Sequence, residues 1–121
     1  MEKVWINNWP QDISQKLYYP LGEIPVHEYL RKNAAAYPDK PLVSYYGKDV
    51  SYREVDHASD RLANYFLAQG LKKGDRIGLF LGNCPQYIIA HYAVLKMGGI
   101  VSPLNSMFKE MELKYQINDC A

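Results

Sequence analysis

One stretch of the chain, GDRIGLFLGNCPQYIIAHYAVLKMGGIVSPLN from Gly74 to Asn105, limits the possible folds more than any other. It opens with an apolar run, Arg76 to Leu81, whose weak alternation is typical of a buried strand. Pro85 suits the first turn of a helix, which we expect to run to about Met97, where two glycines end it. Ile100 to Leu104 indicates a second buried strand. Two strands joined by a single helix predict a right-handed parallel βαβ unit and therefore an α/β fold.

Further helices and a hairpin are expected around this unit. Pro25 favours a helix over about 25–37, and short strands at 42–46 and 50–52 predict a small β-hairpin. Ser51 and Glu54 have the spacing of a capping box, which predicts the start of a long helix that ends at Gly70. A last helix is expected over about 109–119. The fold class predicted is a three-layer α/β fragment with a short β-hairpin, a parallel βαβ unit and covering helices. The inward face of the long helix is expected to carry Val55, Ala58, Leu62, Tyr65 and Phe66.

The first 24 residues differ from the rest of the chain. They contain Trp5, Trp9 and Tyr18 among several prolines, with no period of 2 or 3.6 residues. This composition predicts an extended aromatic arm that lies on a surface. We therefore divide the chain into an amino-terminal arm, residues 1–24, and a folded part, residues 25–121.

Composition excludes several classes of protein. With 121 residues and 48% apolar content, the chain is long enough for one core of its own. Fourteen basic and thirteen acidic side chains give a net charge of +1, which predicts no general attraction to nucleic acid or anionic lipid. Cys84 and Cys120 fit no zinc-ligand spacing and indicate reduced thiols. No signal peptide or transmembrane segment is recognisable, so we expect a cytoplasmic protein.

The turns after the two strands are the first place to look for a ligand site. In an open α/β sheet, ligands bind beyond the carboxyl ends of the strands, which here means residues 82–83 and 105–106. A phosphate cradle needs several converging amides, and Gly82-Asn83-Cys84-Pro85 offers one glycine and a proline without an N–H. The sequence therefore favours a structural cap over a nucleotide contact at this turn.

Other reactive side chains are isolated. Cys84 beside a helix start could be a nucleophile, but no histidine is near it in sequence. His27, His57 and His91 are each expected on a separate helix, and only His57 has an acidic neighbour, Asp60, at ligand spacing. Glycines recur every four residues, but they fall on a helix stop, a turn, a strand and a loop, so they form no helix-packing face: Gly70, Gly74, Gly78 and Gly82. These patterns predict no catalytic, cofactor-binding or metal-binding residue.

Several short stretches, taken together, resemble the start of the adenylate-forming acyl-CoA synthetases. In order, they are YPDKP before a strand, SYRE at a helix start, LKKGDR before the next strand, NCPQ, GGIV and PLN, closing with LKYQINDC. Each is weak alone, but their order and spacing over residues 37–120 make the resemblance specific. The arm segment WINNWPQDI is similar to the amino-terminal extension of long-chain and medium-chain fatty-acid CoA ligases. Two departures are Gly82, where proline is frequent, and Lys109, where serine or threonine usually caps the helix.

The resemblance implies an activity for a parent protein rather than for this chain. Such enzymes activate a carboxylic acid with ATP and magnesium to an acyl-adenylate, then transfer the acyl group to coenzyme A. The phosphate loop ending Pro-Lys-Gly, the Tyr-Gly-x-Thr-Glu segment and the carboxy-terminal lysine of the family would all lie beyond Ala121. We therefore expect an inactive amino-terminal fragment of a fatty-acid CoA ligase, without catalytic residues of its own. The acyl chain length and the acyl acceptor stay open.

Two other functions remain open from the residues alone. The chain could be a stand-alone, non-catalytic interaction module whose aromatic arm binds a partner. A small flavodoxin-type binder is a third alternative, although the phosphate loop that should follow its first strand is missing. As a fragment, the chain would leave the apolar strands 77–81 and 100–104 uncovered, which predicts self-association, for example as a homodimer.

Overall fold

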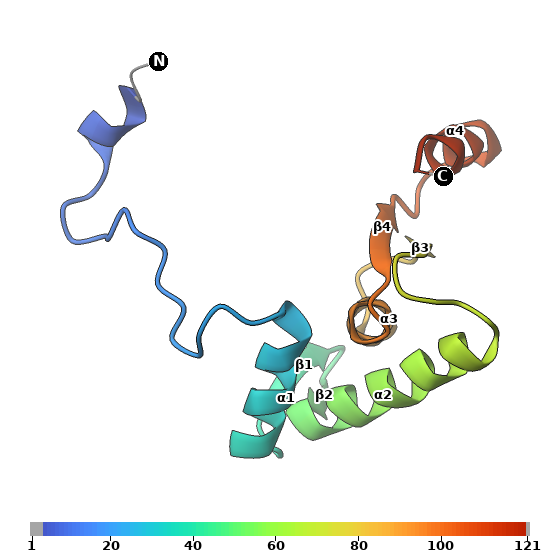
Figure 1. Cartoon of the computed structure of the whole chain (residues 1–121), viewed down its shortest axis with the longest axis horizontal. Coiled ribbons are helices and arrows are strands. Elements are labelled where there is room, and N and C mark those ends of the chain that lie inside the picture. The colour runs from blue at the N-terminus through green and yellow to red at the C-terminus, as the bar shows by residue number, and fades with distance from the viewer. Residues whose placement is uncertain (1–3, 121) are drawn as a thin grey trace.

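The computed structural model describes residues 4–120, and the side chains from Ile6 onward (Figure 1). The described chain contains a short 3₁₀ helix, four α-helices and four strands. In chain order these are η1 Val4–Asn8, α1 Val26–Ala36, β1 Pro41–Tyr45, β2 Lys48–Ser51, α2 Tyr52–Ala68, β3 Arg76–Phe80, α3 Pro85–Lys96, β4 Ile100–Leu104 and α4 Glu110–Cys120.

The predicted βαβ unit is confirmed. Strands β3 and β4 pair in parallel, from Arg76 opposite Ile100 to Phe80 opposite Leu104, and α3 connects them. On one face of this sheet, Ile77 and Leu79 pack against α2 and α3. On the other face lies α4, joined to the sheet by a hydrogen bond from the Arg76 guanidinium to the Cys120 carbonyl (2.9 Å). The fold class expected from the sequence, three layers with a separate hairpin, is therefore correct.

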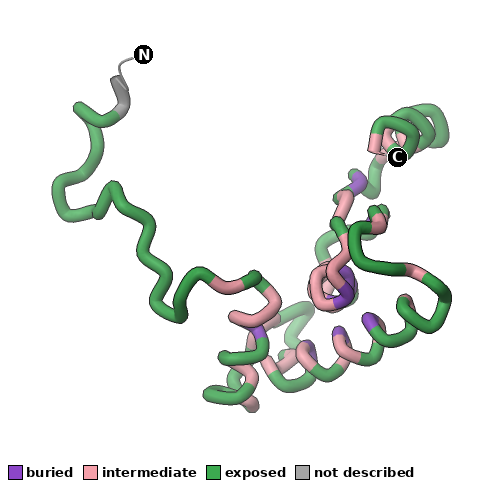
Figure 2. Tube along the Cα trace, viewed as in Figure 1, coloured by how far each residue is buried: buried purple, intermediate pink, exposed green. Residues whose placement is uncertain are grey.

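The core lies mainly between α2, α3 and the sheet (Figure 2). Small side chains line the α2–α3 contact, and they allow the two helices to approach closely. The expected inward face of α2 is wrong at one position, because Tyr65 is 57% exposed. Ser59 and Ala63 are buried instead, one turn apart on the line that begins at Val55. The buried apolar residues are Leu30, Val55, Ala63, Leu79, Ala90, Ala93, Val94, Met97 and Leu104.

The helix and hairpin boundaries follow from local chemistry. Strands β1 and β2 are antiparallel, and the turn between them has positive φ at both Tyr46 (47°) and Gly47 (76°). The capping box is confirmed: the Ser51 hydroxyl accepts the Glu54 N–H (3.3 Å), and the Glu54 carboxylate accepts the Ser51 N–H (2.8 Å). These hydrogen bonds lower the pKa of Glu54. Gly70 ends the α2 region with φ 91°, as predicted.

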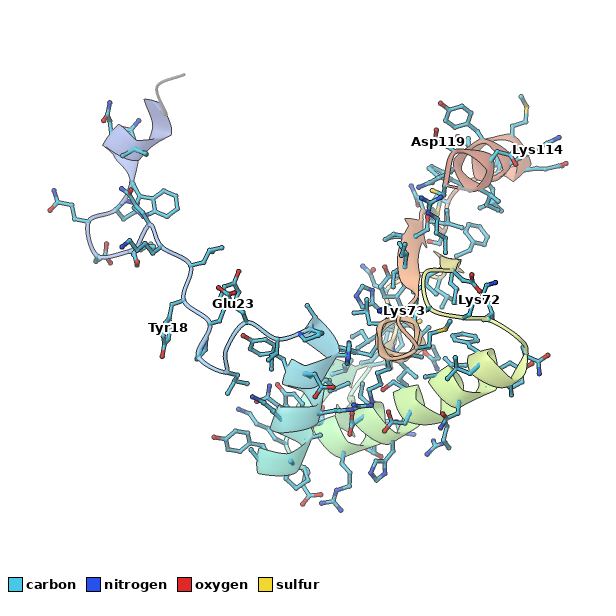
Figure 3. All side chains as sticks on the ribbon, viewed as in Figure 1. Tyr18, Glu23, Lys72, Lys73, Lys114 and Asp119 are labelled. Carbon is cyan, nitrogen blue, oxygen red and sulfur yellow. The ribbon has the colours of Figure 1, made fainter. Side chains whose placement is uncertain are left out.

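The arm projects away from the folded part of the chain (Figure 1). The sequence predicts no regular element there, yet η1 forms within it, because 3₁₀ turns need only local hydrogen bonds. A second local bond runs from the Trp9 indole N–H to the Ile13 carbonyl (2.8 Å). Leu17 and Tyr18 are each 82% exposed, and Figure 3 shows Tyr18 extending from the arm into solvent. The side chain of Trp5 falls outside the described part. Among the described residues, none of the helices is long and apolar enough to span a membrane.

Candidate functional site

The two turns that sequence reasoning selected do come together. Leu81–Asn83 and Pro103–Ser106 form the walls of a cavity of about 380 Å³ beyond the carboxyl ends of β3 and β4. Tyr87 from α3 completes its lining. The topology therefore places these segments where α/β sheets usually bind ligands.

Asn105 in this cavity, and Cys84 next to it in the chain, have structural roles. The Asn105 side-chain oxygen accepts the Met107 N–H (3.0 Å), and the Asn105 carbonyl accepts the Phe108 N–H (3.0 Å). Cys84 is the N-cap of α3, its carbonyl accepts the Tyr87 N–H (3.1 Å), and Pro85 occupies the first turn. With one glycine and a proline that has no N–H, this turn does not fit a nucleotide phosphate. That it acts only as a cap stays a prediction.

The remaining sequence candidates lie apart from one another. Cys84 is half-buried and lines a small apolar cavity with side chains of β1 and α3, none of them a histidine among the described residues. His27, His57 and His91 lie on α1, α2 and α3 respectively, as predicted. Within residues 4–120, no group of three or more His, Cys, Asp or Glu side chains is arranged to hold a metal ion. The prediction that none of these residues is catalytic or ligating remains untested.

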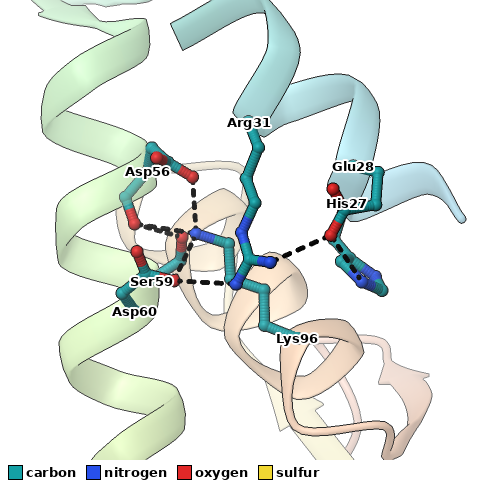
Figure 4. Close-up of polar contacts among 7 residues, drawn as sticks. All are labelled: His27, Glu28, Arg31, Asp56, Ser59, Asp60 and Lys96. Carbon is teal, nitrogen blue, oxygen red and sulfur yellow. Dashed lines mark hydrogen bonds and ion pairs between the residues drawn. The ribbon is translucent and has the colours of Figure 1, made fainter. Parts of the chain in front are cut away.

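The best-organised polar cluster is one that sequence reasoning missed (Figure 4). The Lys96 side chain on α3 is 1% exposed, and its ammonium lies between two acids of α2. It donates to the Asp56 carboxylate (2.6 Å), the Asp56 carbonyl (2.9 Å) and the Asp60 carboxylate (2.8 Å). Because three acceptors surround it, the buried charge of Lys96 is fully compensated.

The cluster continues onto α1. The Arg31 guanidinium lies 3.5 Å from the same Asp60 oxygen and 2.9 Å from Glu28, and Glu28 also lies 3.5 Å from the His27 ring. Burial acts to raise the pKa of Asp60, but hydrogen bonds and charge attraction from Lys96 and Arg31 outweigh it and lower that pKa. Burial, assisted by the nearby cations, lowers the pKa of His27. We refer to these six residues as the Lys96 network: His27, Glu28, Arg31, Asp56, Asp60 and Lys96.

A signal for this network is present in the sequence. Lys96 is the only Lys, Arg, Asp or Glu in the segment 85–97, which is otherwise mostly apolar. Asp56 and Asp60 are spaced by four residues, so they share one face of α2. A lone lysine on a buried helix needs acidic partners, and a pair of acids one turn apart on a neighbouring helix can supply them.

Comparison with known proteins settles the family. A family model described as "AMP-binding enzyme" matches residues 30–121 of the chain. The chain belongs to the AMP-binding enzyme family.

Individual relatives agree with this assignment. The chain is 39% identical over 118 residues to a long-chain-fatty-acid–CoA ligase of Bacillus subtilis, an alignment that covers 98% of this chain and 21% of that protein. Among solved structures, the unliganded O-succinylbenzoate coenzyme A synthetase of B. subtilis has a TM-score of 0.74 at 26% identity, covering 80% of this chain and 20% of that one. The amino-terminal subdomain of NpsA from Klebsiella oxytoca shares the fold, with a TM-score of 0.75 at 22% identity over 78% of this chain and 24% of that one.

The chain spans about a fifth of the length of the curated relatives it matches. Its described residues form a cavity at the sheet end, a satisfied charge network and further apolar cavities.

Proposed function

We propose that this chain is the amino-terminal part of an AMP-forming fatty-acid CoA ligase. One observation carries the proposal: almost the whole chain, 98%, aligns with a long-chain-fatty-acid–CoA ligase at 39% identity. The membership of the AMP-binding family and the similar fold of another coenzyme A synthetase give further support.

In the proposed reaction, the fatty-acid carboxylate attacks the α-phosphorus of ATP and pyrophosphate leaves, which yields an acyl-adenylate. The coenzyme A thiolate then attacks the acyl carbonyl and AMP leaves. Magnesium bound to the phosphates would neutralise their charge, and catalysis would depend mainly on positioning and electrostatic stabilisation. The residues of this chain contribute the βαβ unit and its covering helices, and we propose that they provide a scaffold without reacting groups.

The 121-residue chain by itself should be inactive, because the turn at Gly82 does not fit ATP phosphates. Pyrophosphate release would be measured with ATP, magnesium and fatty acids of several lengths. We expect no release above a control without protein, and no ATP-induced change in the thermal midpoint, since a ligand stabilises only the state that binds it. Release that survives repurification would contradict the proposed inactivity.

The parent activity needs a separate test. The gene should continue past Ala121, to a total of about 500 residues, which is well beyond a single ordinary domain. Expression of the full reading frame should yield fatty-acid-dependent pyrophosphate release and acyl-CoA. A stop codon directly after Ala121 would instead favour the second candidate function, a stand-alone interaction module, which the exposed arm with Leu17 and Tyr18 supports.

We also propose that the isolated chain self-associates. Phe80 (44% exposed) and Ile100 (49%) leave apolar surface on the sheet. Such surfaces tend to pair with a second copy. Sedimentation velocity at tens of micromolar, a range that captures typical weak interfaces, should show a dimer. A single monomeric species with little binding of a hydrophobic dye would contradict this.

We further propose that the protein is cytoplasmic. The two free cysteines, Cys84 and Cys120, fit a reducing compartment.

A further inference from the structure

A groove runs between the β-hairpin and helix α3. It consists of two neighbouring cavities, of about 280 and 330 Å³, and Tyr87 and Ile88 on α3 line both of them. Leu42 and Val43 of β1 form the opposite wall, one in each cavity. We refer to the space between these two walls as the hairpin groove.

The two walls of the groove are each held by α2 rather than by each other. Backbone hydrogen bonds attach the segment before the hairpin to the start of α2: Tyr52 N–H to the Lys40 carbonyl (3.0 Å) and Arg53 N–H to the Pro38 carbonyl (3.1 Å). Helix α3 packs on α2 through the core and the Lys96 network. Within residues 4–120, no hydrogen bond or ion pair joins β1 or β2 to α3. The groove is therefore preformed, as ligand pockets usually are.

Aromatic rings form a large part of the α3 wall. The ring centroids of Tyr87 and His91 are 6.2 Å apart with an angle of 33° between the planes, and Tyr92 meets His91 edge-on at 6.0 Å. Among the described residues, no Lys, Arg, Asp or Glu lines either cavity. A flat ring gains contact by packing against such walls, whereas a charged group would lose its hydration without gaining a partner. The lining therefore favours an uncharged, planar ligand.

One polar atom beside the groove has no structural explanation. His91 borders the larger cavity, and its Nδ1 is the one buried side-chain nitrogen or oxygen without a hydrogen-bond partner in the described part of the chain. Buried polar atoms in folded proteins nearly always have a partner, so an exception points to a function. A neutral imidazole nitrogen donates or accepts according to its tautomer, and a hydroxyl group can do either. A hydroxyl group is therefore the partner that fits His91 in both tautomers.

From these observations we propose that the hairpin groove binds a small, uncharged, planar aromatic molecule that carries a hydroxyl group, that is, a phenol. The aromatic ring lies between β1 and Tyr87, and the hydroxyl group forms a hydrogen bond with His91 Nδ1. The hydroxyl reaches this buried nitrogen once the imidazole turns about its Cβ–Cγ bond toward the open cavity. The site is independent of the acyl-adenylate chemistry proposed for the parent.

Nitrogen NMR of the histidine side chains in the 121-residue chain tests the proposal, with phenol as the probe and toluene as its control. Toluene has the same shape without the hydroxyl group and is more apolar, so apolar contact alone favours toluene. Phenol, titrated to about 20 mM to capture millimolar affinities, should shift the Nδ1 resonance of His91. The resonances of His57, which is exposed on α2, should stay unchanged. If His91 Nδ1 does not respond to phenol, or responds equally to toluene, the proposal is wrong.

Variants separate the hydrogen bond from the shape of the groove. His91→Phe removes the nitrogen but keeps a ring, and His57→Phe makes the same change at an exposed position. The ratio of phenol affinity to toluene affinity should fall about three- to tenfold in His91→Phe, the range for loss of one hydrogen bond, and stay at the wild-type ratio in His57→Phe. An unchanged ratio in His91→Phe would overturn the proposal.

A groove-filling variant keeps the test decisive if His91→Phe fails to fold. Val43→Phe places a larger side chain in the smaller cavity and should weaken the binding of both phenol and toluene. Phenol that shifts the Nδ1 resonance of His91 in Val43→Phe as strongly as in the wild type binds outside the groove, and the assignment of the site is then wrong.

Discussion

The two faces of the β3–β4 sheet are covered in opposite ways. On the side of α2 and α3, Leu79 is 5% exposed and packs against Val94, which is fully buried. On the side of α4, the helix has no buried residue within the described chain, and Met111 is 84% exposed. The helices on the two sides of the sheet, including α4, contain apolar residues at helical spacing. An apolar pattern therefore identifies a helix, but the residues opposite determine whether its apolar face is buried.

The physical reason is the size of the side chains at each contact. Small residues on both helices, such as Ala63 on α2 and Ala93 on α3, bring the two backbones close and leave no gap. Across the sheet, α4 is held mainly by polar bonds, including Gln116 to the Pro103 carbonyl (3.2 Å), and a cavity of about 190 Å³ lies between it and Gly78. The first contact is a core, and the second is a partly filled layer.

Two leucines of the sheet test this difference most strongly. Leu79 (5% exposed) faces α3, and Leu104 (7%) faces α4 and borders two open cavities. Leu79→Ala should lower the free energy of unfolding by about 3–5 kcal/mol, since the tightly packed side cannot collapse around the lost atoms. Leu104→Ala should cost about 2–3 kcal/mol, because its surroundings are already open. Chemical denaturation gives both values, and an equal or larger loss for Leu104→Ala would contradict the comparison.

The same contrast explains which parts of the fold the sequence could predict. Strong local signals sufficed for the βαβ unit, for the hairpin and for the cap at Ser51, since these depend on nearby residues. The burial of Ser59 could not be predicted in this way: a hydropathy pattern counts serine as polar, whereas the α2–α3 contact favours it for its size. Tyr65 is exposed because the buried line of α2 runs through Val55, Ser59 and Ala63, and Tyr65 lies off that line.

The candidate site was predictable in part. The topology rule correctly brought residues 82–83 and 105–106 to one cavity, because parallel strands end at the same edge of a sheet. Lys96 was overlooked because its partners lie 36 and 40 residues away, on a helix that pattern analysis cannot orient. The lone lysine and the pair of acids are visible in the sequence, but which acids face Lys96 depends on how α2 packs against α3.

Acid should weaken the Lys96 network, which joins α1, α2 and α3. The pKa of Asp60 in the folded chain lies below its ordinary value of 3.8, so the unfolded chain binds more protons in that range. The stability contributed by Asp60 is therefore complete above pH 3.8 and is lost as pH falls through the lowered pKa. His27 acts with the same sign at higher pH: its pKa lies below 6.5, so its contribution is complete above pH 6.5 and declines below it.

Denaturation at a series of pH values checks this expectation, with Asp60→Asn and His27→Gln as the two controls. Asp60→Asn should flatten the acid end of the stability curve, and His27→Gln should flatten only the part just below pH 6.5. A wild-type acid slope that survives unchanged in Asp60→Asn would show that the Lys96 network does not respond to protons as its contacts indicate.

The starts of α2 and α4 sharpen the comparison at a smaller scale. At α2 the Ser51–Glu54 box is complete, whereas at α4 only the glutamate half exists: Glu112 accepts the Lys109 N–H (2.8 Å). Ser51→Ala should lower the free energy of unfolding by about 0.5–2 kcal/mol. Lys109→Ser should raise it by roughly 0.5 kcal/mol, because the serine hydroxyl supplies the missing half of the box.

Cys84→Ser should change the free energy of unfolding only slightly, since Cys84 makes no side-chain cap bond. A loss for Cys84→Ser larger than that for Ser51→Ala would indicate a packed or reactive thiol.

The smallest effect is expected on α4 itself. Met111 is 84% exposed, so Met111→Ala removes little buried surface and places a good helix former at an exposed position. The free energy of unfolding should therefore change by less than about 0.5 kcal/mol, as is usual for surface substitutions. Denaturation at two protein concentrations makes the result informative. A loss above about 1 kcal/mol that grows with protein concentration would mean that a second copy covers this face in solution, because only association makes stability concentration-dependent. The two sides of the sheet would then be equally buried in the dimer, and the contrast drawn from the single chain would not hold for the assembled protein.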